Sequence, residues 1–177
     1  MDFVLKKELE TSNLVFISLN QIKKPSEVKK LNNLDRLVIA RGLNEESNRA
    51  ILESKSVDIL LSPESISERD FIHFRNSGLN QVLCKLAKKN DIAIGFDFGF
   101  LIRSGKKETL LGRMMQNVIL CRKYKLKIVL GSFASNSNEI RNKSEIMSFG
   151  KVIGMNGKEI KEALNFRKKE EMIKKIK

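Results

Sequence analysis

Several residue types are scarce or missing in this chain of 177 residues. It has no tryptophan, one tyrosine, two cysteines and one histidine, His73. A single histidine excludes a multi-histidine metal cluster and leaves little room for histidine-assisted hydrolysis. We expect His73 to be partly buried beside Phe71 and Phe74. Cys84 and Cys121 fall on the apolar sides of expected helices, so we expect reduced core thiols in a cytoplasmic protein.

Long apolar segments and familiar catalytic motifs are also missing. No run of about 18 apolar residues occurs, and the opening MDFVLKKELE lacks the apolar core of a signal peptide. We therefore expect neither a membrane span nor export. The sequence also contains no GxGxxG fingerprint, P-loop or nucleophile elbow.

Asp97 is the carboxylate with the most suggestive position. It ends an apolar strand, and barrel enzymes place catalytic groups at the carboxyl ends of strands. Its neighbours between Gly95 and Phe100 are all glycine or phenylalanine and supply no second metal ligand. Asp58 and Glu64 are equally unsupported. We therefore expect a structural hydrogen-bonding role for Asp97 and no bound metal or cofactor, with a small metal-dependent phosphoesterase of barrel fold as the weaker alternative.

Positive charge, in contrast, is abundant. The chain has 34 lysines and arginines against 21 aspartates and glutamates, a formal net charge of +13. Such an excess favours a polyanionic partner, most simply nucleic acid. A lysine-rich solvated surface is the plainer alternative.

Strand and helix patterns alternate along the chain. The clearest stretch, residues 80–130, reads helix, strand, helix, strand, and its strands are apolar runs typical of parallel sheets covered on both sides. We leave residues 66–76 without an assigned element. Strands are expected at 2–5, 14–19, 37–40, 57–61, 93–98 and 128–130. Helices are expected at 26–30, 44–54, 80–90, 108–125, 138–141, 144–153 and 157–164, with Asn44 and Asn156 as N-caps and a C-terminal cap at Gly154.

This alternation predicts one α/β domain over residues 1–177, with parallel strands and right-handed crossovers. A complete (β/α)8 barrel typically needs about 250 residues. We therefore predict a trimmed barrel of six or seven mainly parallel strands with surrounding helices, and a doubly wound open sheet as the second choice. Residues 167–177 are expected to form a frayed, basic C-terminal helix.

The longer helices combine an apolar face with a basic one. On a helical wheel, Val82 joins the apolar face of the first, and Lys85 and Lys88 lie opposite. In the second helix, Arg113 and Lys123 fall opposite the apolar arc. Leu120 projects toward the polar side. Basic side chains on such faces suit phosphate groups.

The chain carries, in order, SGLNQVLCKLAKKNDIAIGFDFGFLIRSGKK, RKYKLKIVLGSFA and NEIRNKSEIMSFGKVIGMNGKEIKEAL. From about Arg41 to Leu164 it resembles the archaeal and eukaryotic ribonuclease P protein component 3 family. In that family a glycine and an asparagine lead into a helix, as Gly78 and Asn80 do here. A strand of the IAIEFN kind follows, where this chain has IAIGFD.

The resemblance implies a fold similar to a TIM barrel, related to metal-dependent phosphoesterases of the polymerase and histidinol phosphatase type but without their histidine-rich site. It implies a non-catalytic, RNA-binding subunit of ribonuclease P, whose RNA uses magnesium to remove the 5′ leader of precursor tRNA. The implied partners are that RNA, ribonuclease P protein component 2 and the other subunits, and precursor tRNA indirectly. A general module for structured RNA is a further alternative.

Some positions depart from the family pattern. The family's His-Pro is Ser62-Pro63 here, its helix-opening histidine is Gln81, and an arginine after the IAIEFN strand is Gly99. We therefore expect RNA binding to rely on other basic groups. The candidate contacts are Lys85, Lys88, Arg103, Lys106, Lys107, Arg113, Arg122, Lys123, Arg141 and Lys143.

Overall fold

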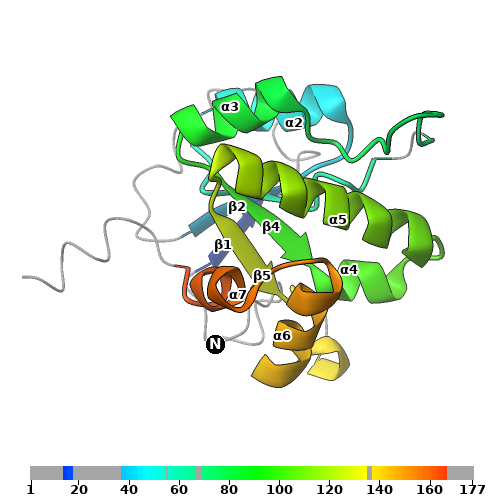
Figure 1. The fold of residues 1–177 in the computed structure, drawn as a ribbon. Coiled ribbons are helices and arrows are strands. Elements are labelled where there is room, and N and C mark those ends of the chain that lie inside the picture. The colour runs from blue at the N-terminus through cyan, green and yellow to red at the C-terminus, as the bar shows by residue number, and fades with distance from the viewer. Residues whose placement is uncertain (1–13, 18–36, 55, 67–68, 135–136, 167–177) are drawn as a thin grey trace, which may run out of the picture.

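Short apolar strands build a parallel sheet in the computed structural model, which describes residues 14–17, 37–54, 56–66, 69–134 and 137–166. Five strands lie side by side in the order in which they occur along the chain (Figure 1). Each neighbouring pair is parallel; Ile94, for example, lies beside Ile128. The strands are β1 (Leu14–Ile17), β2 (Leu37–Arg41), β3 (Ile59–Leu61), β4 (Ala93–Asp97) and β5 (Ile128–Gly131).

The predicted parallel α/β class is therefore confirmed. All five strands fall within ranges expected from the sequence, apart from one residue at the end of β2 and one at the end of β5. The expected strand at 2–5, the helix at 26–30 and the C-terminal helix at 167–177 lie outside the described residues. Within the described residues, no helix is both long and apolar enough to cross a membrane.

Asparagine side chains begin several of the helices. Asn44, Asn80 and Asn156 each accept a hydrogen bond from a backbone amide of the first turn that follows. Gly154 has a φ of +90°, the left-handed geometry expected after α6. The helices are α2 (Glu45–Glu53), α3 (Gln81–Lys89), α4 (Phe98–Arg103), α5 (Lys107–Tyr124), α6 (Lys143–Val152) and α7 (Gly157–Leu164), with a 3-10 turn, η3 (Ser137–Glu139).

Two of these elements differ from the sequence expectation. Phe98 does not extend β4, because Asp97 accepts a hydrogen bond from the Phe100 amide at 2.8 Å and so caps the unexpected short helix α4. The segment predicted as a helix at 138–141 forms only the 3-10 turn η3.

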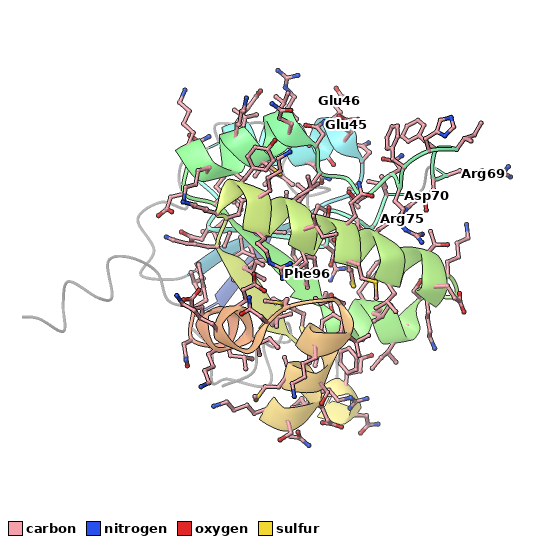
Figure 2. The ribbon with its side chains drawn as sticks, viewed as in Figure 1. Glu45, Glu46, Arg69, Asp70, Arg75 and Phe96 are labelled. Atoms are coloured by element: carbon pink, nitrogen blue, oxygen red, sulfur yellow. The ribbon has the colours of Figure 1, made fainter. Side chains whose placement is uncertain are left out.

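The two faces of the sheet are covered differently. The larger core joins Val38, Leu60, Phe96 and Leu130 to residues of α2, α3, α5, α6 and α7. Phe96 of this core is labelled in Figure 2. Strand residues of the opposite face, including Ile39, form a second cluster with Phe133. Among the described residues, no helical side chain belongs to that second cluster. The helices whose side chains are described therefore pack on one face of a sheet whose strands β2 to β5 have buried residues on both faces.

Gly78 determines the path of the backbone into α3. Its φ is +73°, and a Cβ atom there would lie 1.8 Å from the carbonyl oxygen of Pro63. The buried amide of Asn48 donates to that same carbonyl at 3.1 Å and to the Gly78 carbonyl at 3.0 Å. The glycine that the family resemblance singled out is therefore required by close packing between the ends of β3 and α3.

Helical wheels misplaced two side chains. Val82 is 56% exposed, although it was expected on the packed face of α3. Leu120 of α5 is partly buried and packs against the core instead of projecting away from it. Whether a side chain is buried depends on where the neighbouring elements lie, which the wheel of a single helix does not show.

Candidate functional site

An ion pair closes the carboxyl end of the sheet. Arg41 ends β2 and Asp97 ends β4, and an Arg41 Nη2 atom lies 2.5 Å from Asp97 Oδ2. Arg103 approaches the same oxygen at 4.0 Å, and the Arg41 guanidinium lies 5.1 Å from the centre of the Phe100 ring. Arg41 was not predicted as part of a site, because only carboxylates at strand ends were considered and not the cations that would neutralise them.

Asp97 is a structural group in this arrangement. Its side chain is fully buried, and this burial raises its pKa although Arg41 acts in the opposite direction. Both oxygens are engaged, one by arginine and the other by the Phe100 amide. Among the described residues, no group of three or more histidine, cysteine, aspartate or glutamate side chains could hold a metal ion.

Glu64 is a second buried carboxyl at this end of the sheet. It follows β3 and is 0% exposed, and its Oε2 accepts a hydrogen bond from Asn117 at 3.1 Å. Burial raises its pKa to about 8. Glu64 is therefore mainly neutral at pH 7, a state that its sequence context did not indicate.

Arg113 is buried, which corrects its expected place on an exposed basic face. Its side chain is 6% exposed, and its Nε atom donates to Asp70 at 2.7 Å. Its Nη1 atom donates to the carbonyl of Ile66 at 2.9 Å and of Glu64 at 3.3 Å. Arg113 therefore anchors the segment after β3 to α5, and we leave it out of the candidate RNA surface.

The segment at residues 69–76, here called the 69–76 loop, projects beyond the helices (Figure 1). His73 is exposed in it, so its expected partial burial beside the phenylalanines is wrong. Phe71 and Phe74 stack on each other with ring centres 4.5 Å apart and are themselves exposed. Residues 66–76, left unassigned from the sequence, contain no helix or strand in the part that the structure describes.

The remaining basic candidates divide between the two ends of the sheet. One set follows the carboxyl ends of β4 and β5, and we call it the carboxyl-edge group. Arg103 joins its two parts, because it pairs with Glu139 of η3. Arg141 donates to two backbone carbonyls beside η3. The carboxyl-edge group consists of Arg103, Lys106, Lys107, Arg141 and Lys143.

The other set lies where α3 and α5 lead back into strands, and we call it the amino-edge group. Lys88 Nζ donates to the carbonyl of Lys125 at 2.8 Å, which ties the ends of these helices together. Arg122 is held by both oxygens of Glu159, at 2.7 and 2.8 Å, and by the Gly154 carbonyl. Arg122 in turn lowers the pKa of Glu159. The amino-edge group consists of Lys85, Lys88, Arg122 and Lys123.

A pocket of about 440 Å³ opens at the carboxyl end. It lies between the segment after β3 and the start of α5, and Arg69 and Lys106 contribute basic groups to its lining. Phe100 and Leu110 supply apolar surface, and Ser65 and Thr109 supply hydroxyls. Glu64 and Asp70 also line it, so the pocket combines acidic, basic and apolar groups and suits a polar ligand.

These features define a parallel α/β protein with a basic surface and no metal-ligand cluster among its described residues. The chain belongs to the RNase P subunit p30 family, whose model matches residues 5–172. It is 35% identical to ribonuclease P protein component 3 of Methanosarcina acetivorans over 148 residues, covering 82% of this chain and 59% of the relative. It is 34% identical to the component 3 of Thermococcus gammatolerans, covering 81% of this chain and 65% of that relative.

A solved structure agrees with this assignment. The fold is similar to a chain in a cryo-EM structure of archaeal ribonuclease P with mature tRNA, with a TM-score of 0.70 and 25% identity. The match covers 92% of this chain and 65% of that chain. The chain thus spans less than two thirds of the length of these relatives.

The raised pKa of Glu64 predicts a loss of stability as pH rises. Between the unfolded value of 4.5 and the folded value of about 8, the folded state holds a proton that the unfolded state releases. The free energy of unfolding should therefore fall over that range, by up to about 4 kcal/mol. Urea unfolding of the wild type and of Glu64→Gln at pH 5 and pH 8.5 measures this change in the free energy of unfolding.

Glu64→Gln should lose most of this pH dependence, because its amide stays neutral. Glu53→Gln is the control, since Glu53 has an exposed side chain and the change should leave the dependence intact. Equal pH dependence in wild type and Glu64→Gln would refute the assignment.

Replacing Arg113 tests its role as an anchor. Arg113→Met should lower the free energy of unfolding by about 2–3 kcal/mol, because the buried carbonyls and Asp70 lose their donors. Urea unfolding at pH 7 provides the measurement. Arg49→Met is the control; Arg49 forms an exposed i,i+4 pair with Glu53, worth about 0.5 kcal/mol or less. Equal losses in the two variants would show that Arg113 is not an anchor.

Proposed function

We propose that this chain is an RNA-binding subunit of ribonuclease P, which supports the catalytic RNA in removing the 5′ leader from precursor tRNA. The observation that carries the proposal is membership of the RNase P subunit p30 family along almost the whole chain. The similarity to a chain of an archaeal ribonuclease P bound to mature tRNA supports it. The chain acts as part of a holoenzyme endoribonuclease and does not perform the cleavage itself.

The proposed partners are ribonuclease P RNA, ribonuclease P protein component 2 and the other protein subunits, with precursor tRNA contacted indirectly. Magnesium serves the RNA, and this chain binds no cofactor of its own. The engaged state of Asp97 agrees with a supporting role, because both of its oxygens already have protein partners. We also propose that the chain acts in the cytoplasm.

The fold proposal is a trimmed barrel formed by one domain. Two observations support it: the strands follow chain order, and the described helices pack on one face of the sheet. A doubly wound sheet, the second choice, would place helices on both faces. The buried second cluster corresponds to the inner face of such a barrel.

Within this function, we assign the RNA-facing role to the carboxyl-edge group. Its lysines are exposed, and one of them, Lys106, lines the pocket at this end of the sheet. Each group also contains cations that are bound to groups of the protein, Lys88 and Arg122 at the amino edge and Arg103 and Arg141 at the carboxyl edge, so the pocket is what distinguishes the two ends. The carboxyl end of a parallel sheet is also where α/β folds most often place ligands.

Reconstitution of cleavage tests the function. Ribonuclease P RNA and the other subunits should cleave precursor tRNA faster, or at lower magnesium concentration, when this chain is added. An unchanged rate and magnesium requirement would contradict the proposal. Equal binding to unrelated structured RNAs would instead favour a general RNA-binding module.

Two triple variants test which end of the sheet faces RNA. Lys106→Ala, Lys107→Ala and Lys143→Ala together should weaken binding to ribonuclease P RNA and reduce the salt dependence of log K by about two. Lys85→Ala, Lys89→Ala and Lys123→Ala remove the same charge from the other end and should change both quantities little. Filter binding over a salt series gives the affinities. The reverse result would place RNA at the amino edge.

A further inference from the structure

The tip of the 69–76 loop exposes three large apolar side chains. Phe71 is 55% exposed, Ile72 95% and Phe74 59%. These three lie within four consecutive residues, so the exposure is concentrated at one point. Contiguous exposed apolar side chains on a folded protein mark a contact surface.

The loop is held in shape at its tip. The Phe71 amide donates to the Phe74 carbonyl at 3.0 Å, which holds the bend over residues 72–74 closed. The two rings stack with an interplanar angle of 29°. Each ring therefore covers one face of the other and leaves its outer face available.

The base of the loop is tied to the body of the protein. Asp70 accepts from Arg113 at 2.7 Å and from the Asn76 amide at 3.0 Å, and it pairs with Arg75 at 3.4 Å. Gln116 of α5 donates to the Arg75 carbonyl at 3.2 Å. A loop anchored in this way loses little conformational entropy when it binds.

Basic groups surround the apolar tip. Arg69 and Arg75 flank it, and Figure 2 shows Arg69 pointing away from the body of the protein. Asp70 is the acidic residue of the loop, and Arg113 and Arg75 neutralise it, which lowers its pKa. Arg69 also lines the pocket that Lys106 shares. The tip is thus apolar at its centre and cationic at its rim.

We propose that the 69–76 loop binds unpaired bases of an RNA, which stack on the outer faces of Phe71 and Phe74 while Arg69 neutralises a nearby phosphate. This inference rests on the proposed function and names a contact site within it. Aromatic rings with adjacent cations are how proteins hold single-stranded RNA, because every base has a face that can stack. The positive rim favours RNA over an apolar protein partner.

The test uses the full chain with two probes, ribonuclease P RNA and a short single-stranded oligouridine. Replacing both rings, Phe71→Ala with Phe74→Ala, should weaken binding to each probe about 5- to 100-fold. The salt dependence of log K should stay as in the wild type, since no charge is removed. Ultraviolet crosslinking followed by mass spectrometry should place a nucleotide adduct on Phe71 or Phe74 of the wild type.

Two further variants distinguish base stacking from a general apolar contact. Phe71→Leu with Phe74→Leu keeps apolar area but removes the aromatic faces, so it should lose nearly as much affinity as the alanine pair. Val82→Ala removes an exposed apolar group from α3 and should bind as the wild type does. Circular dichroism and urea unfolding confirm that each variant is folded.

The outcomes separate this inference from the function on which it rests. If the loop variants bind both probes like the wild type, the stacking site is wrong although the ribonuclease P role stands. If the leucine pair retains full affinity for both probes, the two side chains contribute only apolar area and the inference of base stacking fails. If the wild type binds oligouridine through these rings but does not stimulate cleavage, the ribonuclease P role fails and the stacking site stands.

Discussion

The ion pair between Arg41 and Asp97 determines the arrangement of the carboxyl end of the sheet. A carboxylate without solvent is costly unless cations or hydrogen-bond donors compensate it. Arg41 supplies the cation from the end of β2, and the Phe100 amide supplies a donor at the start of α4. Compensation of one buried carboxyl thus joins two strands and begins a helix. That helix leads, through Lys106, to the first turn of α5.

Gly99 allows a second arginine to approach the buried carboxylate of Asp97. A Cβ atom there would lie 2.6 Å from the Ser132 carbonyl and 3.0 Å from Arg103 Nη1. The glycine therefore lets Arg103 lie against the backbone of α4, within 4.0 Å of Asp97.

Local signals predicted the parts of the structure that depend on neighbours in sequence. The asparagine caps and the apolar strands follow from short patterns, so their positions could be predicted closely. Arg113 could not be placed in this way, because its partner Asp70 lies 43 residues away. The same holds for His73, whose exposure follows from where the segment after β3 is anchored. A helical wheel describes one helix by itself, whereas the burial of its side chains depends on every element that packs against it.

Net charge alone also could not locate a binding surface. A formal charge of +13 suggests a polyanionic partner, but a parallel sheet separates residues that follow strands from residues that precede them. At both ends an acidic residue holds an arginine, Glu159 with Arg122 and Glu139 with Arg103, while the neighbouring lysines remain exposed. Arg113, in contrast, is not available to an RNA, because its charge is buried and holds the 69–76 loop in place. The position of each cation relative to its partners, and not the total, decides which of them are available to an RNA.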